Sequence, residues 1–421
     1  MNLRKILFWL HLSAGVFAGV IVFIMSVTGV LLTYEKQMLA WSDLRHYRSA
    51  PPPGAQRLSI DALLAKVRDE KGSLPAAVTL RPHPSDPVAF VFGREGTVYA
   101  NPYTGELLGA GSTGLRSFFR VVTDWHRWLG AGTEGRATGK AITGACNLAF
   151  LFLVCSGLYL WWPRNWRWVN VKSVVLFRGG LGGKARDFNW HNVIGFWCCV
   201  PLFFVVLGAT VISYPWASNL VYRAAGEEPP ARRGPGGPGP ASSGPRRGGP
   251  GGAGDAPAEL SLEGFDKLQA RASQQVPGWT TISLRLPASD GEPVSFVIDQ
   301  GSGQPHLRST LTLNRQTAAV ERWETFSGSS RGQQWRSFLR FIHTGEIGGF
   351  PGQTIAGIAS LGACFLVWTG LALSWRRYRA WMGRRGSAPG VPVRAAATRA
   401  VTSEREIEEQ EVTLSKRSSN L

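Results

Sequence analysis

Four of the seven histidines in this sequence lie at the ends of long apolar runs, where an imidazole could bind a metal. His11 and His191 each open an apolar run, whereas His126 and His343 each come shortly before one. A histidine at the mouth of a membrane helix is costly unless something binds it. Two histidines on facing helices suit a b-type haem, whose iron takes one imidazole on each face of the macrocycle. The pattern predicts two bis-histidine haems b, with these four side chains as axial ligands of the iron.

The two halves of the chain repeat the same arrangement around the first histidine of each half. Gly15 follows His11 by four positions, as Gly195 follows His191, and a tyrosine comes at the same distance beyond each histidine. We interpret this as an internal two-fold duplication, which would bring equivalent residues face to face across a pseudo-axis. The predicted ligand pairs are His11 with His191, and His126 with His343.

A haem also needs space and cations, and the sequence offers both near these histidines. Gly15 and Gly195, one helical turn after their histidines, would remove side chains where the flat ring lies. Anionic propionates favour nearby cations. The cofactor-binding candidates are Arg120 and Arg340 on one side of the membrane, with Arg127 beside them, and Arg4, Lys5 and Arg186 on the other.

Other readings of the same residues stay open. A single boundary histidine can be a capping or interfacial residue. The segment from Gly15 to Gly19 has the spacing of a common helix-packing motif that needs no cofactor. Zinc also binds histidine, but it favours additional cysteine or carboxylate ligands, which are lacking at these positions. The duplication of four histidines, two at each membrane face, favours haem.

The elements that must position the histidines are four membrane helices. The apolar runs cover residues 6–32, 141–162, 193–212 and 354–373, each is long enough to span a bilayer, and none contains Asp, Glu, Lys or Arg. The net charge of +18 is concentrated before the first run, between the second and third, and after the fourth. Short basic segments stay cytoplasmic. This predicts a multi-pass membrane protein with both termini cytoplasmic, two large loops on the opposite side, a retained first helix and no nucleic-acid partner.

The segments between the runs have the character of small α+β modules. Helices are predicted over 59–70 and 262–274, with strands over 77–81, 88–92, 97–100, 281–286, 294–299 and 309–314, and a further short strand after residue 106. The first half is predicted to consist of a membrane helix at 1–34, a module at 35–116, and a histidine segment with the second membrane helix at 117–163. A basic loop at 164–188 leads to the third membrane helix at 189–216, and a disordered Gly/Pro/Arg linker lies within 217–258. The second half ends with a module at 259–334, a histidine segment with the fourth membrane helix at 335–377, and a disordered tail at 378–421.

Six motifs in the chain look familiar when taken together. They are His11-x-x-x-Gly15 with Thr28-Gly29, Asn101-Pro102-Tyr103-Thr104-Gly105, Trp125-His126-Arg127-Trp128-Leu129, Ser156-Gly157-Leu158-Tyr159-Leu160-Trp161-Trp162-Pro163, Asn189-Trp190-His191-Asn192-Val193-Ile194-Gly195 and His343-Thr344-Gly345-Glu346. With these motifs the chain resembles the PepSY-associated transmembrane family of bacterial inner-membrane proteins over most of its length.

The resemblance implies four membrane helices, periplasmic PepSY-like modules and a link to iron acquisition. Some members look like di-haem ferric-siderophore reductases, and the family histidines map onto His11, His126, His191 and His343. The long linker departs from the compact family pattern.

We therefore expect an oxidoreductase that passes electrons through two haems to a periplasmic ferric chelate, most plausibly a ferric siderophore, and so releases Fe(II). The donor would be a quinol or another membrane or cytoplasmic partner, because the glycine-rich segment 179–183 lacks the flanking strand and helix of a dinucleotide site. The alternative is a membrane-anchored module that binds peptides or regulates a protease without redox activity. A haem or metal transporter ranks last, because no charged or broken helix interior marks a path.

Overall fold

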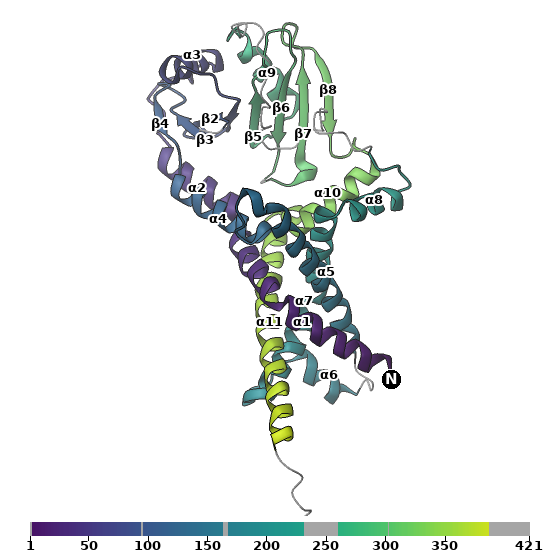
Figure 1. Cartoon of the computed structure of the whole chain (residues 1–421). Coiled ribbons are helices and arrows are strands. Elements are labelled where there is room, and N and C mark those ends of the chain that lie inside the picture. The colour runs from purple at the N-terminus through teal and green to yellow at the C-terminus, as the bar shows by residue number, and fades with distance from the viewer. Residues whose placement is uncertain (1, 94–95, 163–166, 231–259, 302, 387–421) are drawn as a thin grey trace, which may run out of the picture.

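Four long apolar helices form one end of the molecule in the computed structural model, which describes residues 2–93, 96–162, 167–230, 260–301 and 303–386 (Figure 1). They are α1 (Leu3–Leu32), α5 (Arg136–Trp161), α7 (Gly183–Ser213) and α11 (Gly349–Gly386). Each belongs to a helical segment that is long and apolar enough to cross a bilayer. The prediction of a helical membrane protein with four spans is confirmed at this level.

These helices pack as a four-helix bundle. Helix α1 contacts α5 and α11, and α7 contacts the same two neighbours. Ala18, Ala359 and Ala363 are buried at the helix contacts, where small side chains let helix backbones approach closely. Large apolar side chains such as Phe17 and Ile358 point outward and are exposed, as lipid contact requires. One end of the bundle carries the N-terminus and many arginines and lysines, and we call it the basic end. The opposite end, next to the β-strands, is the sheet end.

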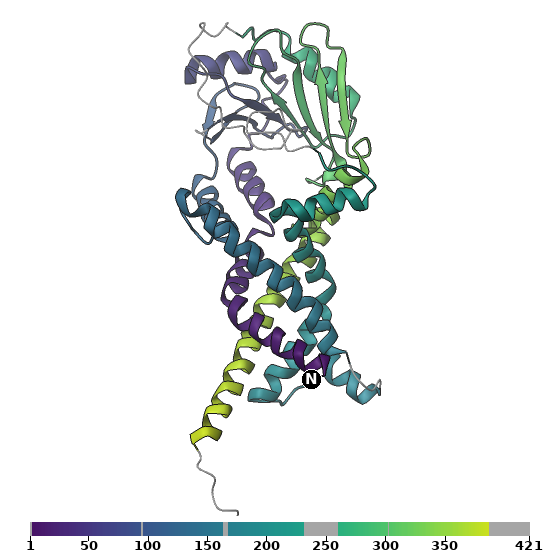
Figure 2. The same cartoon turned by 45° about the vertical axis from the view of Figure 1, so that its right-hand side comes forward.

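Four shorter helices connect the bundle to the sheet. They are α2 (Glu35–Tyr47), α4 (Thr113–Trp128), α8 (Pro215–Ala224) and α10 (Arg331–His343). Helix α4 packs on α1, and α10 packs on α7 and α8. Both α4 and α10 leave aromatic side chains exposed, including Phe118, Trp125, Trp335 and Phe338. Aromatic residues favour the boundary between membrane and water, and Figure 2 shows these helices between the four-helix bundle and the sheet.

The two extramembrane segments share one antiparallel sheet of eight strands, in the order β4-β3-β2-β1-β5-β6-β7-β8. The strands are β1 (Ala77–Leu80), β2 (Val88–Phe92), β3 (Gly96–Ala100), β4 (Leu107–Gly109), β5 (Thr281–Arg285), β6 (Val294–Asp299), β7 (Arg308–Leu313) and β8 (Val320–Thr325). Strand β1 pairs with β5, with Ala77 opposite Arg285 and Leu80 opposite Ile282. This pairing joins the two modules, and β8 is a strand that the sequence analysis did not predict.

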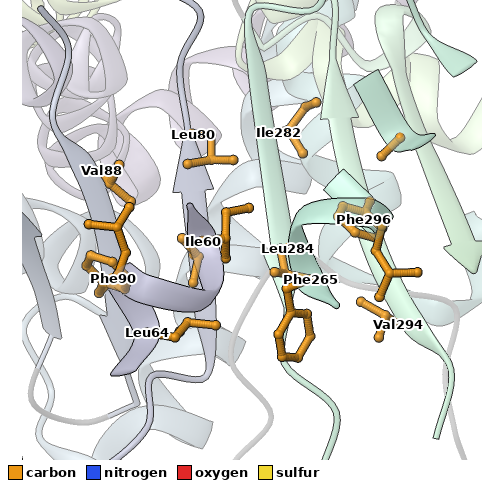
Figure 3. Packing of buried hydrophobic residues seen from close by; sticks show 14 of the residues in the cluster. Ile60, Leu64, Leu80, Val88, Phe90, Phe265, Ile282, Leu284, Val294 and Phe296 are labelled. Atoms are coloured by element: carbon orange, nitrogen blue, oxygen red, sulfur yellow. The ribbon is translucent and has the colours of Figure 1, made fainter. Parts of the chain in front are cut away.

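A single hydrophobic core lies between the sheet and two helices, α3 (Ile60–Lys71) and α9 (Phe265–Gln275). Figure 3 shows that side chains from both halves meet in it, among them Phe90 from the first half and Phe296 from the second. Both of these phenylalanines are fully buried, and burying a large apolar side chain contributes about 1.5–3 kcal/mol. The two modules thus form one folded unit.

Two aspartates link α3 in the first half of the chain to α9 in the second half. Asp61, on α3, accepts hydrogen bonds from the backbone N–H groups of Gly264 and Phe265 at the start of α9, at 2.8 and 2.9 Å. Asp266, on α9, accepts one from the N–H of Ile60 at the start of α3, at 2.7 Å. Carboxylates stabilise helix N-termini, whose first N–H groups lack partners within the helix. Burial, with a contribution from Asp266, raises the pKa of Asp61.

The structure differs from the sequence predictions in several connecting segments. Helix α11 continues to Gly386, so the predicted disordered tail begins too early, while residues 387–421 lie outside the described residues. Trp375, Tyr378 and Trp381 form a row of ring contacts along this extension. Helix α8, with Pro215 at its first position, lies between the third membrane helix and the predicted linker, of which residues 231–258 lie outside the described residues. Helix α6 (Trp168–Val175) was not predicted in the basic loop. Three short 3-10 turns complete the elements: η1 (Thr133–Gly135), η2 (Pro305–Leu307) and η3 (Glu346–Gly348).

Candidate functional site

At the basic end, His11 on α1 and His191 on α7 line one cavity within the bundle. We call them the basic-end pair. The cavity has a volume of about 1240 Å³, which exceeds the roughly 300–1,000 Å³ of common small-molecule pockets. Its walls come from all four membrane helices. The cavity is therefore large enough for a cofactor, and two histidines from different halves of the chain line it.

Glycines keep this cavity open. Gly15 and Gly195, the two predicted from the sequence, line it together with three further glycines: Gly19, Gly157 and Gly370. A Cβ atom added at Gly15 would meet only the Leu153 side chain, at 3.8 Å, and one at Gly195 only that of Leu366, at 3.6 Å. Both separations are ordinary contacts, so these two glycines are not demanded by helix packing. Their effect is to leave volume beside the histidines.

Six basic side chains line the same cavity: Arg4, Lys5, Lys184, Arg376, Arg377 and Arg384. Three of them are held by neighbouring groups. Arg4 donates to the backbone carbonyl of Leu160 at 2.5 Å, Arg376 pairs with the buried Asp187 at 3.0 Å, and Arg377 lies over the rings of Phe8 and Trp9. An anionic group at the mouth of the cavity would find several cations within reach. Arg186 is not among the lining residues and pairs with Asp187 instead.

At the sheet end, His126 on α4 and His343 on α10 form the second pair. Their ring centroids lie 6.1 Å apart and their planes are tilted by 40°. Metal–imidazole bonds are about 2.0–2.1 Å long, so two imidazoles on opposite sides of one metal ion have centroids about 6 Å apart. The separation of this sheet-end pair would therefore allow both imidazoles to bind one metal ion.

The two arginines predicted beside the sheet-end pair are both exposed. Arg340 comes three residues before His343 on α10, and side chains at that spacing share a helix face. Its guanidinium lies over the ring of Phe341, at 5.5 Å. Arg120 comes six residues before His126 on α4, a spacing that places it on a different face. The arrangement favours Arg340 over Arg120 as the cation beside its histidine.

All four histidines are held through the same ring nitrogen. The Nδ1 atoms of His11, His191 and His126 lie 2.8–2.9 Å from side-chain hydroxyls of a neighbouring helix. The hydroxyl partners, in that order, are Ser156 on α5, Thr369 on α11 and Thr28 on α1. Each of these three hydrogen bonds involves Nδ1. A histidine that binds a metal through one nitrogen is usually oriented by a hydrogen bond from the other.

His343 uses a backbone group in place of a hydroxyl. Its Nδ1 lies 2.8 Å from the carbonyl oxygen of Val205 on α7, so Nδ1 must be the donor. The close approach depends on Gly208, because a Cβ there would lie 2.3 Å from the Leu339 carbonyl oxygen and 3.0 Å from the His343 Cβ. No shift of a flexible side chain would relieve the first of these contacts, so a glycine is required where α10 crosses α7.

A polar cluster fixes α4 to the sheet. Asp43 on α2 accepts hydrogen bonds from the Tyr99 hydroxyl at 2.7 Å and from the Ser112 backbone N–H at 2.8 Å. It also pairs with Arg116, in the first turns of α4. Burial, together with the hydrogen bond to Asp43, raises the pKa of Tyr99 to about 12. Strand β3, α2 and the helix that carries His126 are thereby held together.

The hydroxyl partners of the histidines were not predicted as site residues. A signal was present, because Ser156-Gly157 and Thr369-Gly370 are the same kind of dipeptide in the second and fourth apolar runs. A Cβ at either glycine would meet the Cε1 atom of the neighbouring histidine, at 3.3 Å from His11 and 3.4 Å from His191. The dipeptide thus provides an acceptor and a flat surface for the imidazole ring.

The titratable groups form no cluster of three metal ligands in the described part of the chain. No three His, Cys, Asp or Glu side chains gather there closely enough to hold a metal ion. A haem iron needs only two protein ligands, because the macrocycle supplies the other four. His46, His83 and His306 lie in the extramembrane part, away from the two pairs.

A comparison with protein families agrees with this architecture. The model of the PepSY-associated TM region matches residues 8–377, a range that includes all four histidines. No curated protein matches the chain. Because the match covers most of the sequence, the chain belongs to the family of proteins with a PepSY-associated transmembrane region.

Proposed function

We propose that this protein carries electrons across the bacterial inner membrane through two bis-histidine haems b and reduces a periplasmic ferric chelate of the siderophore class. The basic-end pair, His11 and His191, would hold one haem, and the sheet-end pair, His126 and His343, the other. When bound, haem supplies a one-electron couple whose potential the protein tunes. The chain's own residues orient the imidazoles, enclose the macrocycle and neutralise its propionates.

The cavity between His11 and His191 is the observation that carries this proposal. It combines two histidines from different helices, a wall of five glycines and six basic side chains. A flat, largely apolar macrocycle with two carboxylates needs that combination of ligands, space and charge. An interfacial role for the histidines would explain neither the volume nor the glycines that provide it.

The sheet-end pair supports a second haem on independent grounds. Its two rings come from helices in different halves of the chain, and their separation corresponds to that of two axial ligands. Two haems at opposite ends of a bundle would divide a hydrocarbon layer of about 30 Å into shorter electron-transfer steps. This suits a protein whose task is to connect two sides of a membrane.

The direction of transfer follows from charge and from the place of the sheet. The basic end would be cytoplasmic by the positive-inside rule, which puts the sheet in the periplasm. A ferric siderophore there would take one electron per iron, and the Fe(II) formed binds hard oxygen ligands less tightly. Electrons would enter at the basic end, from a quinol or a separate donor.

The experiment that tests the proposal is a dithionite-reduced minus oxidised visible spectrum of the purified protein, with haem quantified per chain. We expect two low-spin b-type haems per chain, which a ferric siderophore re-oxidises after reduction. A colourless protein from cells with ample haem would contradict the proposal. The peptide-binding or protease-regulating alternative would then become the better hypothesis for the sheet.

A further inference from the structure

Three buried hydroxyl groups face the histidines in a way that fixes which ring nitrogen carries the proton. Ser156 is 5% exposed, Thr28 is 8% exposed and Thr369 is fully buried. Each hydroxyl lies within 2.8–2.9 Å of a histidine Nδ1. Little water reaches these groups, so the hydrogen-bond pattern is decided by the protein atoms around them.

The direction of each bond follows from the second contact of the hydroxyl. Ser156 Oγ lies 2.6 Å from the carbonyl oxygen of Phe152, Thr369 Oγ1 lies 2.7 Å from that of Phe365, and Thr28 Oγ1 lies 2.7 Å from that of Ile24. A carbonyl only accepts, so a hydroxyl that bonds the helix backbone in this way donates its single hydrogen there. In that arrangement the hydroxyl oxygen accepts from the imidazole, whose Nδ1 carries a hydrogen.

We propose that Ser156, Thr369 and Thr28 are positioning residues that hold His11, His191 and His126 in the Nδ1–H tautomer, leave Nε2 free to bind iron, and tune the two haem sites separately. The inference rests on the proposed function for the identity of the iron group. A neutral imidazole carries one N–H, so its position at Nδ1 leaves a lone pair at Nε2. Donation from Nδ1–H also raises the basicity of the ligand nitrogen and thereby favours ferric over ferrous iron.

The three hydroxyls are divided between the two sites. Ser156 and Thr369 serve the basic-end pair, whereas Thr28 serves only His126 of the sheet-end pair. The fourth histidine, His343, donates to the backbone carbonyl of Val205, which no side-chain substitution removes. Each site therefore has its own removable acceptors, and the structure predicts which haem each substitution affects.

The first test uses the protein without haem and therefore does not depend on the cofactor. We would label the histidines with nitrogen-15 and read the tautomer from the ring-nitrogen chemical shifts, assigning His191 by its loss in His191→Ala. In the unaltered protein we expect His191 to be protonated at Nδ1. Thr369→Val keeps the shape and removes the acceptor, so the preference for this tautomer should be lost, and Thr369→Ser should restore it. An unchanged tautomer in Thr369→Val would overturn the inference.

The second test is a redox titration of the haem-loaded protein. We expect Thr369→Val and Ser156→Ala each to raise the midpoint potential of the basic-end haem and to leave that of the sheet-end haem unchanged. At a fixed applied potential, the ferric-to-ferrous ratio of the basic-end haem should change at least threefold. Thr28→Val should shift the other haem instead. Ser360→Ala is the matched control, because Ser360 on α11 also donates to a backbone carbonyl, that of Ala356, and its hydroxyl makes no hydrogen bond with a histidine in the described part of the chain.

The outcomes separate this inference from the proposed function. If the protein binds two haems but their potentials stay unchanged in Thr369→Val, Ser156→Ala and Thr28→Val, the positioning role is wrong and the haem assignment stands. If the protein never binds haem, the proposed function fails, and the nitrogen-15 spectra still decide whether the hydroxyls fix the tautomers. If Ser360→Ala shifts a potential as much as Thr369→Val does, the effect is a general response to altered packing, which would also overturn the inference.

Discussion

The basic-end and sheet-end histidine pairs differ in the kind of helix that carries them. His11 and His191 lie on two long membrane helices, α1 and α7, beside a cavity that glycines keep open. His126 and His343 lie near the ends of α4 and α10, shorter helices at the membrane boundary, with their rings already 6.1 Å apart. One pair belongs to the bundle, and the other connects the bundle to the sheet.

This difference indicates which pair responds to events at the sheet. Helix α4 follows β4 directly, and α10 follows β8 after a short turn. The cluster of Asp43, Tyr99 and Arg116 ties α4 to β3 as well. A ligand that moves the sheet would therefore act on the sheet-end pair first. The basic-end pair is insulated from it, because its helices are held by the bundle.

Removal of a ligand from one pair gives the largest expected effect. If the two proposed haems are bound, His191→Ala should lose one of them completely and leave the sheet-end haem in place, because the pairs share no side chain. Haem per chain and the reduced-minus-oxidised spectrum measure this. His306→Ala, which alters an exposed histidine on η2, should keep both haems. Loss of both haems from His191→Ala would show that the two sites are not independent.

Filling the cavity should affect the basic-end site almost as strongly. Gly195→Leu adds a side chain where the nearest described atom, Leu366 Cδ2, is 3.6 Å from the added Cβ, so the extra volume enters the cavity. We expect most of the basic-end haem to be lost while the thermal unfolding temperature stays the same or rises. Retention of both haems at full occupancy would mean that the macrocycle does not lie beside Gly195.

Substitution of a glycine at the sheet end should lower the stability of the protein, in contrast to Gly195→Leu. Gly208→Ala forces a Cβ to 2.3 Å from the Leu339 carbonyl oxygen, and overpacking of this kind costs about 1–3 kcal/mol. The shift of α10 should weaken the sheet-end haem and lower the unfolding temperature. Gly15→Ala is the matched control, because its Cβ would meet only an ordinary contact. Equal unfolding temperatures for the two variants would refute the crossing geometry.

The smallest expected effect comes from the cation beside the sheet-end pair. Arg340 is exposed, and exposed ion pairs contribute about 0–1 kcal/mol. Arg340→Gln should therefore weaken haem retention at the sheet end by less than about tenfold, and Arg120→Gln should do less. A competition assay with a haem-binding acceptor protein would measure both. A larger effect of Arg120→Gln would reverse the assignment drawn from helix spacing.

Much of the membrane part could be predicted because its signals are local. An uncharged apolar run specifies a span, and the repeated spacing of His11 with Gly15 and His191 with Gly195 pointed to one shared site. The structure brings these four residues to the same cavity. The hydroxyl partners escaped notice because Ser156 and Thr369 lie far from their histidines in the sequence. A serine or threonine in a membrane helix commonly bonds only its own backbone.

The sheet shows where local reasoning stops. Apolar strands such as β2 and β6 were predicted at their observed bounds. Strand β8 (Val320–Thr325) was missed, since most of its residues are exposed and the segment contains Glu321, Arg322 and Glu324. The pairing of β1 with β5 has no local signal, because the two strands are separated by two membrane helices. Nothing in either segment alone indicates that they share an edge.

The pairing of β1 with β5 means that the sheet can be completed only late in the synthesis of the protein. Strand β1 is made before α5 and α7, and its neighbour β5 is made after both. Until β5 emerges, the first half of the sheet has an open edge at β1, and the N–H of Ile60 lacks its carboxylate from Asp266. A nascent chain that stalls before its third membrane helix would therefore expose the unpaired edge of β1. Unpaired strand edges favour aggregation. Closure of the sheet then signals that three of the four membrane helices have already been made.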